Sequence, residues 1–343
     1  MNRRILHVLR RFEPGGVELW LLDLLRSGGV PGCRLEFLTT LDGRYDGEVR
    51  QAGGVLHRWD GSIASIRETL EKLGPFDAVH SHVHRFSGFI LDAARHVGTP
   101  LRIAHSHCQQ PERWWWRRVY GGVMRRILAT GATLRLAVSR AAAVDLFGTT
   151  DGVTIAPAAR DLRRYAHPSD RGSARARFGL SDDCIAVAHA GRLVPEKNQR
   201  LLLDIASRHP RIRILLAGDG PLRNSLRHPQ AIHLGHVEDL ASVFAAADCF
   251  ALPSRSEGLG LSLVEAQAAG LPCVVSDRVP EEAIVERGRV ERVGLGSPAA
   301  HWTAALLRAC ERGFDSGAWR RLLLSPFHIE RSRELLEAVY DGR

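Results

Sequence analysis

The amino-acid sequence predicts an α/β protein with two doubly wound domains. Short apolar runs typical of buried strands alternate with longer segments of helical spacing, and this alternation implies parallel sheets covered by helices. The pattern appears twice along the chain, and a polar, basic stretch over residues 159–183 separates the two series. At 343 residues, the chain also has the length of two typical domains.

The first series covers residues 1–158 and contains apolar runs that are expected to form strands. These runs span residues 4–9, 34–40, 54–59, 76–82, 101–107, 134–139 and 152–157. Between the first two runs, Leu19, Leu22 and Leu25 follow helical spacing, and Gly28 can end that helix. We therefore expect repeated strand-helix-strand units in this domain.

The second series covers residues 184–322 and resumes the same alternation. Its expected strands span residues 184–192, 212–220, 231–237, 248–254 and 272–277. Asp219 and Pro221 are typical of a turn from strand to helix, and a further helix is expected over residues 261–269. Residues 159–183 lack a strand pattern, so they are expected to link the two domains.

The composition is that of an ordinary globular protein, with 45% hydrophobic and 25% charged residues. No run approaches the roughly 18 apolar residues that a membrane span needs. The apolar run at the basic N-terminus is broken by His7, Arg10 and Arg11, which does not suit a secretory signal. The six cysteines lack the spacing of a disulfide frame or a metal site. These features predict a cytoplasmic protein with reduced thiols.

The charge balance favours an anionic partner. The 47 basic and 38 acidic residues leave a net charge of +9. Nucleic acid, phospholipid and a phosphorylated small molecule all fit this excess. Only Lys72 and Lys197 are lysines, so the chain uses arginine at every other basic position. A lysine beside a candidate site therefore indicates a specific role.

The turns after the strands are the candidate sites, because ligands of open parallel sheets bind at the carboxyl ends of the strands. After the first strand, Gly15 and Gly16 can bring backbone amides close to an anion at a helix start, or can form a plain tight turn. Later in the chain, Arg192 and Lys197 converge on one strand end. A guanidinium and an ammonium placed together in this way suit a diphosphate.

Two carboxylates, Glu257 and Glu265, stand in an otherwise apolar segment. On one continuous helix they would point about 80° apart and lie about 12 Å apart along the axis. Gly258 and Gly260 instead predict a loop before a helix that begins near Leu261, with amides that suit an anion. Carboxylates beside an anion site repel the anion unless they face hydroxyl groups. The arrangement therefore predicts a ligand that carries both phosphate and sugar.

Several segments taken together carry a more specific signal. They are GGVELWLLDL, HSHVHRFSG, RIAHSH, GRLVPEKN, LLAGDGPL, IHLGHVEDL and SEGLGLSLVEAQAAGLPCVVSD. The combination resembles the retaining glycosyltransferases of family 4, and is most similar to members acting in capsular or exopolysaccharide assembly. The resemblance implies the glycosyltransferase B fold, with two Rossmann-like domains facing a central cleft. It also implies that residues 323–343 form a C-terminal helix that crosses back to the first domain.

The resemblance further implies transfer of a sugar from a nucleotide-diphosphate sugar, with UDP-sugar as the favoured donor, to a glycan or lipid-linked saccharide. Arg192 and Lys197 would hold the diphosphate, Glu265 would bind the ribose, and Glu257 and His107 would act at the transferred sugar. Backbone groups expected to assist donor binding belong to Gly15, Gly16, Gly258, Leu259, Gly260 and Leu261. Such enzymes typically need no metal or other cofactor, because fixed cations and amides stabilise the departing phosphate.

Three alternatives remain open beside this interpretation. A nucleotide-sugar 2-epimerase of the same fold would use the same donor pocket without an acceptor. A metal-dependent hydrolase is suggested by His80, His82 and His84, which could form a cluster with His105 and His107. A basic nucleic-acid-binding protein is suggested by charge alone, without a recognisable binding motif. The resemblance favours neither a metal nor a nucleic-acid partner.

A segment rich in tryptophan and arginine, residues 112–128, is the candidate for contact with an acceptor or an anionic membrane surface. On a helix, an apolar stripe would follow Trp116, Tyr120, Val123, Met124 and Ile127. The candidate contact residues are Trp114, Trp115, Trp116, Arg117, Arg118 and Arg125. Such stripes usually pack on their own domain, but tryptophan with arginine also suits lipid headgroups. This hypothesis would place the protein on the inner face of the membrane.

Overall fold

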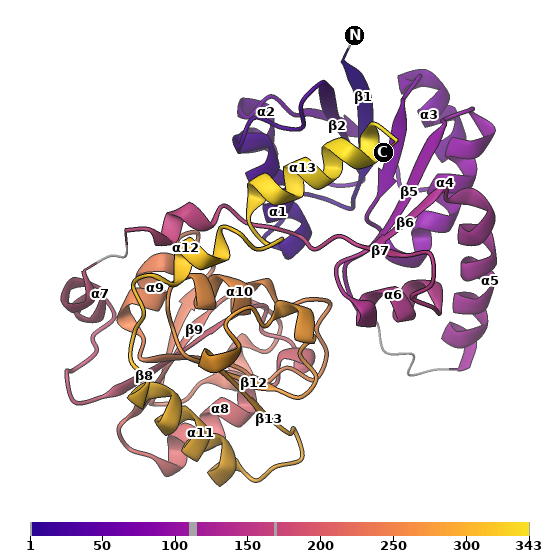
Figure 1. The fold of residues 1–343 in the computed structure, drawn as a ribbon. Helices are drawn as coiled ribbons and strands as arrows, with labels where there is room; N and C mark the ends of the chain where they lie inside the picture. Colours follow the sequence, from indigo (N-terminus) through magenta and orange to yellow (C-terminus); the bar gives the residue numbers. More distant parts are fainter. Residues whose placement is uncertain (1, 110–114, 168–169, 343) are drawn as a thin grey trace. The chain divides into compact units, whose positions relative to one another are not determined.

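The computed structural model describes residues 2–109, 115–167 and 170–342. The chain divides into two compact units, which Figure 1 shows as ribbons. The first unit comprises Met1–Arg160 and Pro326–Arg343, and the second comprises Asp161–Ser325. The last helix of the chain therefore belongs to the first unit, whereas most of the segment expected to link the domains belongs to the second.

The first unit is built on a fully parallel sheet with the strand order β3-β2-β1-β4-β5-β6-β7. Its strands are β1 (Arg3–Val8), β2 (Cys33–Thr39), β3 (Val55–Arg58), β4 (Ala78–Ser81), β5 (Leu101–Ser106), β6 (Leu134–Ala137) and β7 (Thr154–Ile155). All of these strands lie within or next to the apolar runs that the sequence predicted. The strand order reverses between β1 and β4, so ligands are expected at the carboxyl ends of these two strands.

Helices cover both faces of the first sheet. They are α1 (Gly16–Arg26), α2 (Asp46–Gln51), α3 (Ile66–Leu73), the 3-10 helix η1 (His84–Phe86), α4 (Ser87–His96), α5 (Trp115–Gly131), α6 (Arg140–Phe147) and α13 (Ile329–Tyr340). Leu6 and Val8 of β1 join a buried cluster with residues of α3, α4, α5 and α6. Because side chains alternate along a strand, His7 points to the opposite face, where it meets Tyr340 of α13.

The second unit contains a second fully parallel sheet, with the strand order β10-β9-β8-β11-β12-β13. Its strands are β8 (Ile185–Ala190), β9 (Ile212–Ala217), β10 (Ala231–Gly235), β11 (Cys249–Leu252), β12 (Cys273–Ser276) and β13 (Val290–Val293). The first five were predicted. The edge strand β13 was missed, because Glu291 and Arg292 interrupt any apolar run. The order of this sheet reverses between β8 and β11.

The second sheet is also covered by helices. They are η2 (Leu162–Tyr165), α7 (Arg171–Arg177), η3 (Pro195–Lys197), α8 (Gln199–Arg208), η4 (Arg223–Leu226), α9 (Leu240–Ala246), α10 (Leu261–Ala268), η5 (Glu281–Ala283), η6 (Arg287–Arg289), α11 (Ala299–Glu311) and α12 (Ala318–Leu322). The helix predicted over residues 261–269 is confirmed. The turn from strand to helix expected at Asp219 and Pro221 leads only into the short 3-10 helix η4. Pro229 disfavours helical backbone at the residue before it, and β10 begins two residues later.

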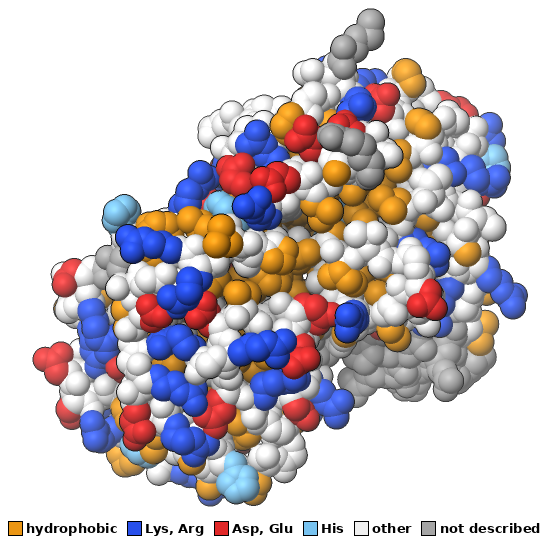
Figure 2. Space-filling model, in the orientation of Figure 1, with side chains coloured by type: hydrophobic (Ala, Val, Ile, Leu, Met, Phe, Trp, Pro, Cys, Tyr) orange, Lys and Arg blue, Asp and Glu red, His pale blue; other side chains and the backbone are white. Residues whose placement is uncertain are grey.

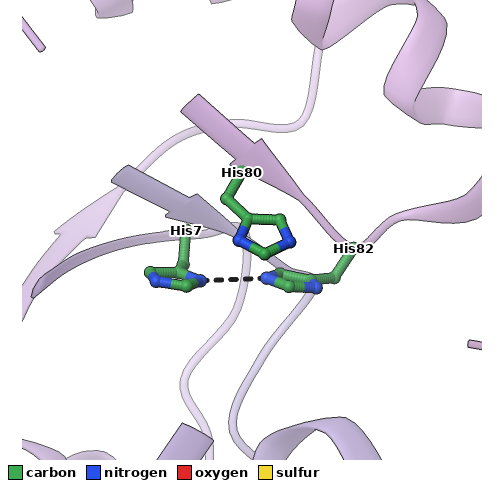
Figure 3. A group of neighbouring side chains, drawn as sticks. All are labelled: His7, His80 and His82. Atoms are coloured by element: carbon green, nitrogen blue, oxygen red, sulfur yellow. Dashed lines mark hydrogen bonds between the residues drawn. The ribbon is translucent and has the colours of Figure 1, made fainter. Parts of the chain in front are cut away.

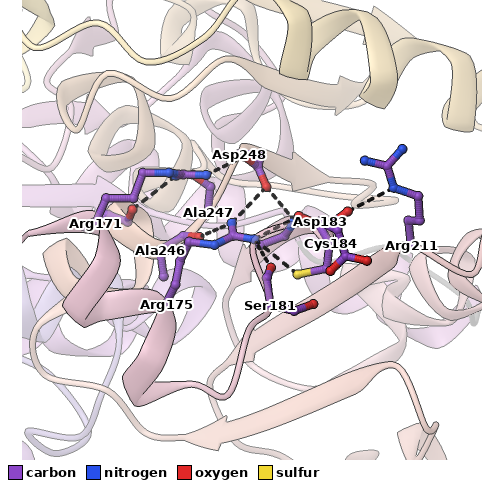
Figure 4. Close-up of polar contacts among 11 residues, drawn as sticks. Arg171, Arg175, Ser181, Asp183, Cys184, Arg211, Ala246, Ala247 and Asp248 are labelled. Carbon is purple, nitrogen blue, oxygen red and sulfur yellow. Dashed lines mark hydrogen bonds and ion pairs between the residues drawn. The ribbon is translucent and has the colours of Figure 1, made fainter.

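Part of the segment expected as a linker is anchored to the second sheet by arginines of α7 (Figure 4). Arg171 donates to Asp248 Oδ1 at 2.6 Å, and Arg175 donates to the carbonyl oxygens of Ser181 and Cys184 at 2.6 and 2.9 Å. Asp248 Oδ2 also accepts from the backbone amide of Ala186 in β8 at 2.7 Å. These contacts explain why a polar stretch without a strand pattern groups with the second unit.

The surface carries mixed charges. On the face shown in Figure 2, Lys and Arg side chains are interspersed with Asp and Glu side chains. The net positive charge is therefore spread over that face and does not form one basic stripe. None of the helices in the described part of the chain is long and apolar enough to cross a bilayer. The six cysteines are free thiols.

Candidate active site

The second sheet brings Lys197 and Glu257 into one ion pair at the point where its strand order reverses. Lys197 follows β8, and Glu257 follows β11. Lys197 Nζ donates to Glu257 Oε1 at 2.6 Å, and the Ser254 hydroxyl donates to the same oxygen at 2.7 Å. Glu257 is only 6% exposed. A carboxylate can remain buried there because it is both paired and hydrogen-bonded.

Glu265 occupies a separate, buried position on α10. It is 4% exposed, and its Oε1 accepts a hydrogen bond from the Tyr165 hydroxyl at 3.0 Å. Tyr165 lies in η2, in the segment that the sequence reading treated as a linker. The sequence therefore predicted the carboxylate but not its partner, because nothing in the local pattern joins residues so far apart in the chain.

Arg192 is exposed, whereas its backbone carbonyl is hydrogen-bonded to a buried side chain. Gln199 Nε2 donates to the Arg192 carbonyl at 2.8 Å and lies 3.2 Å from His189 Nε2. His189 Nδ1 is 2.9 Å from the Ala251 carbonyl of β11. Burial lowers the pKa of His189 to about 4, so the ring is neutral at neutral pH and can accept from Gln199 at Nε2. These two side chains, which the sequence reading missed, join the ends of β8 and β11.

Two glycines have a positive φ at this end of the sheet, and one of them allows a close approach of two backbone segments. Gly218 has a φ of +138°, and a Cβ atom at this position would lie 2.0 Å from the Gly191 carbonyl oxygen. Gly260 has a φ of +96° and immediately precedes α10. The first backbone amides of a helix have no acceptors within the helix. The turn formed by Gly258, Leu259, Gly260 and Leu261 leads into such amides at the start of α10, and amides of this kind suit an anion. This placement agrees with the loop that the sequence predicted between the two carboxylates.

In the first unit, His107 follows β5, and Gly15 and Gly16 form the turn that begins α1. Gly15 has extended backbone, with a φ of −158°. Helix α1 places Trp20 beside the histidines, with ring centroids 5.5 Å from His105 and 5.7 Å from His107. The glycine turn thus leads into the helix that covers His107.

Five histidines of the first unit gather at the carboxyl ends of β1, β4 and β5, and we refer to them as the histidine cluster. The members are His7, His80, His82, His105 and His107. Figure 3 shows three of them, with His7 and His82 joined by a hydrogen bond. Burial lowers the pKa of His7 and of His105 to about 3, and it lowers the pKa of the other three well below the ordinary value. All five rings are therefore neutral at neutral pH.

The structure corrects the expected membership of this cluster. His84 was predicted to share a face with His80 and His82, but it begins η1 with a φ of +53° and pairs with Asp145 at 2.8 Å. His7 takes part instead, because the parallel register sets it opposite His80. Within the described chain, two triads have ring nitrogens close enough to hold a metal ion. They are His7, His80 and His82, and His82, His105 and His107.

The predicted apolar stripe of residues 112–128 is divided in the structure. Met124 of α5 is buried next to Gly88 of α4, whereas Tyr120 and Val123 are 38% and 47% exposed. Arg125 was expected to face a membrane, but it donates to the Asp145 carbonyl at 3.2 Å. The other predicted contact residues lie outside what the structure describes. This applies to Trp114 as a whole and to the side chains of Trp115, Trp116, Arg117 and Arg118.

Comparison with known proteins connects these features to a family. Residues 185–312 match the family described as glycosyl transferases group 1. The chain is 32% identical to the putative glycosyltransferase EpsF of Bacillus subtilis (strain 168), over 91% of this chain and 89% of the relative. It is 27% identical to the UDP-Gal:alpha-D-GlcNAc-diphosphoundecaprenol alpha-1,3-galactosyltransferase of Escherichia coli, over 63% of this chain and 61% of the relative.

A solved structure supports the fold. Anabaena HepE in complex with UDP-glucose has a TM-score of 0.83 and 19% identity, and the match covers 99% of this chain and 100% of that chain. The two parallel-sheet units thus have the glycosyltransferase B fold that the sequence predicted. Because the similarity to EpsF extends over most of both chains, this chain belongs to the glycosyltransferases, with its group 1 domain in the second unit.

Proposed function

We propose that this chain is a retaining glycosyltransferase of family 4 that moves a sugar from a UDP-sugar to a glycan or lipid-linked saccharide in cell-surface polysaccharide assembly. The ion pair between Lys197 and the buried Glu257, beside the start of α10, carries the proposal. The UDP-glucose complex of HepE supports a UDP-sugar donor. The acceptor named for the Escherichia coli relative, a diphosphoundecaprenol-linked saccharide, supports a lipid-linked acceptor.

The ion pair suggests how donor binding would begin. A diphosphate that approaches Lys197 competes with Glu257 for the ammonium group, and Arg192 offers an exposed guanidinium on the same strand end. Glu257 is then free to accept hydrogen bonds from hydroxyls of the transferred sugar. Glu265, held by Tyr165, would accept from the ribose. The amides at the start of α10 would stabilise the departing phosphate, so no metal is required.

The reaction would proceed on one face of the sugar. The acceptor hydroxyl attacks the anomeric carbon as the bond to the diphosphate breaks, and the leaving phosphate oxygen takes the hydroxyl proton. No protein nucleophile is needed, and Glu257 contributes binding and electrostatic stabilisation. His107 of the first unit would act at the reacting sugar. The proposed setting is the cytoplasm, where nucleotide sugars are made available to such enzymes.

Thermal unfolding across a panel of nucleotide sugars and free nucleotides tests the donor assignment. At a ligand concentration near 100 times Kd, a UDP-sugar is expected to stabilise the protein by about 2.7 kcal/mol, or on the order of 5 °C. Glu265→Gln should reduce this shift, whereas Glu257→Gln should keep it and lower turnover. Equal effects of both variants would contradict the separate roles. Consumption of nucleotide sugar without an acceptor would instead indicate an epimerase-like reaction.

We also propose that α5 contacts an anionic membrane surface through its exposed apolar residues. Val119, Tyr120 and Val123 are 59%, 38% and 47% exposed on one turn of this helix. In low salt, the protein is expected to sediment with vesicles containing anionic lipid, and Val119→Glu combined with Val123→Glu should leave most of it in the supernatant. Leu324→Glu is the matched control, since Leu324 is 76% exposed on the second unit. Equal sedimentation of both variants would exclude α5 as the contact.

A further inference from the structure

The histidine cluster and Tyr340 form one continuous series of hydrogen bonds, which we call the hydrogen-bond chain. It starts at the Ala156 carbonyl, which lies 2.9 Å from His105 Nε2. His105 Nδ1 lies 3.1 Å from His80 Nε2, and His80 Nδ1 lies 2.8 Å from the Tyr340 hydroxyl. The chain continues from this hydroxyl to His7 Nε2 at 3.3 Å.

The hydrogen-bond chain then continues from His7 of β1 through His82 to His107, which follows β5. His7 Nδ1 lies 3.0 Å from His82 Nε2, the link drawn in Figure 3. His82 Nδ1 lies 2.8 Å from His107 Nε2. His107 Nδ1 is buried and makes no hydrogen bond to any residue that the structure describes. The chain therefore has a carbonyl at one end and an unpartnered ring nitrogen at the other.

The carbonyl end determines the position of every proton in the chain. A carbonyl oxygen can only accept, so His105 must donate from Nε2 and, being neutral, must accept at Nδ1. His80 then donates from Nε2 and accepts from the Tyr340 hydroxyl at Nδ1. Tyr340 in turn accepts from His7 Nε2. Each neutral ring has one N–H group, so each link leaves only one choice for the next.

The same requirement of one N–H group for each neutral ring fixes the proton positions of His82 and His107. His7 Nδ1 accepts from His82 Nε2, and His82 Nδ1 accepts from His107 Nε2. His107 has then used its only proton, and its Nδ1 holds an unshared lone pair. Every donor along the chain has an acceptor, and the only unused group is this lone pair. Five neutral rings can therefore lie together with every N–H group of the hydrogen-bond chain paired to an acceptor.

We propose that this chain of hydrogen bonds holds His107 in the tautomer that accepts at Nδ1, so that His107 receives a hydrogen bond from a sugar hydroxyl. In this proposal, Tyr340 is the positioning residue that maintains the tautomer. The inference rests on the proposed function, which places His107 at the reacting sugar. An Nδ1 lone pair can accept from a hydroxyl but cannot donate to a phosphate oxygen. The chain thus assigns His107 to a hydroxyl and not to the leaving diphosphate.

The tautomers can be read directly by long-range proton-nitrogen correlation spectra of the full-length protein labelled with nitrogen-15 histidine. His107→Gln identifies the signals of His107 by their loss. The proposal expects an unprotonated Nδ1 and a protonated Nε2 on His107 near neutral pH. A protonated Nδ1 on His107 would overturn it, and so would a stoichiometric metal ion in the purified protein, because a metal would occupy lone pairs that the chain needs.

Tyr340→Phe removes the one hydroxyl that connects the two halves of the chain. His7, His82 and His107 then lose their link to the Ala156 carbonyl, and His107 is expected to become a mixture of tautomers. We expect kcat to fall about tenfold as the competent fraction falls, with little change in KM for the nucleotide sugar. An unchanged tautomer, or a changed tautomer with unchanged kcat, would overturn the role of Tyr340.

Ser332→Ala is the matched control. Ser332 lies on the same helix α13, is buried, and accepts from Trp20 Nε1 at 2.8 Å, but it is not part of the chain. Its loss is expected to lower the melting temperature about as much as Tyr340→Phe while leaving the His107 tautomer and kcat unchanged. Failure of the wild-type protein to turn over any nucleotide sugar would refute the proposed function alone, since the tautomer is measured without substrate.

Discussion

Lowering the pH from about 7 to about 5.5 is expected to destabilise the first unit far more than the second. Burial lowers the pKa of His7 and of His105 to about 3, and it lowers the pKa of His80, His82 and His107 in the same direction. In the unfolded chain these rings take up protons near pH 6.5, whereas in the folded unit they stay neutral. Acid therefore favours the unfolded state.

The sign and size of this effect follow from proton linkage. A histidine with a lowered folded pKa contributes its full stability above about pH 6.5 and loses it as the pH falls below that value. Over this interval each such ring costs on the order of 1 kcal/mol, so the histidine cluster costs on the order of 5 kcal/mol. In the second unit, burial lowers the pKa of His189, and this ring is expected to cost only about 1 kcal/mol.

Hydrogen exchange measured by mass spectrometry separates the two units. Peptides from β4 and β5 should lose protection between pH 7 and about pH 5.5, after correction for the intrinsic exchange rate, while peptides from β11 and β12 should keep it. His105→Gln keeps a neutral donor and acceptor at one position, so it should reduce the loss by roughly a fifth. Parallel loss in both units would show that the histidine cluster is not the cause.

Replacing Lys197 with methionine is expected to cost both stability and activity. The substitution leaves the Glu257 carboxylate 6% exposed with the Ser254 hydroxyl as its remaining close donor. Breaking a buried ion pair from one side costs about 3 kcal/mol. Loss of a cation that stabilises the departing diphosphate should also lower kcat by roughly 100-fold or more. Urea unfolding and initial rates with the nucleotide sugar identified by thermal shift measure the two effects.

The other lysine of the chain provides a matched control. Lys72 pairs with Glu68 on the surface of α3, with both side chains more than half exposed, so Lys72→Met should cost less than about 0.5 kcal/mol and leave kcat unchanged. The double variant Lys197→Met with Glu257→Gln removes the unpaired charge, and it should recover stability but not activity. Recovery of both would mean that Lys197 serves the fold and not the reaction.

Most of the fold could be predicted from the sequence because its central strands are buried on both faces. Such strands appear as continuous apolar runs, and all the described strands except β13 were found in this way. That edge strand has charged residues and forms only by pairing with β12. The helix expected after Asp219 and Pro221 is limited to the short η4, since the short connection to β10 does not allow a longer one.

The candidate site was predicted in its residue types but not in its pairings. Lys197, Glu257 and Glu265 were all identified from their surroundings in the sequence. The direct contact between Lys197 and Glu257 was not, because the prediction gave one to the diphosphate and the other to the sugar. Their strands are neighbours in the sheet but far apart along the chain. Tyr165 was missed for the same reason.

By itself, the sequence determined that this chain forms two parallel-sheet units of the glycosyltransferase B fold and at which strand ends the candidate binding residues lie. These properties depend on residue type and on short-range spacing. Only the tertiary structure decided that His7 and Tyr340 contact the histidines of the neighbouring strands. It also decided that His84 lies outside the cluster and pairs with Asp145. The strand register and the packing of α13 bring together residues from both ends of the chain, and the order of protons along them has meaning only in that arrangement.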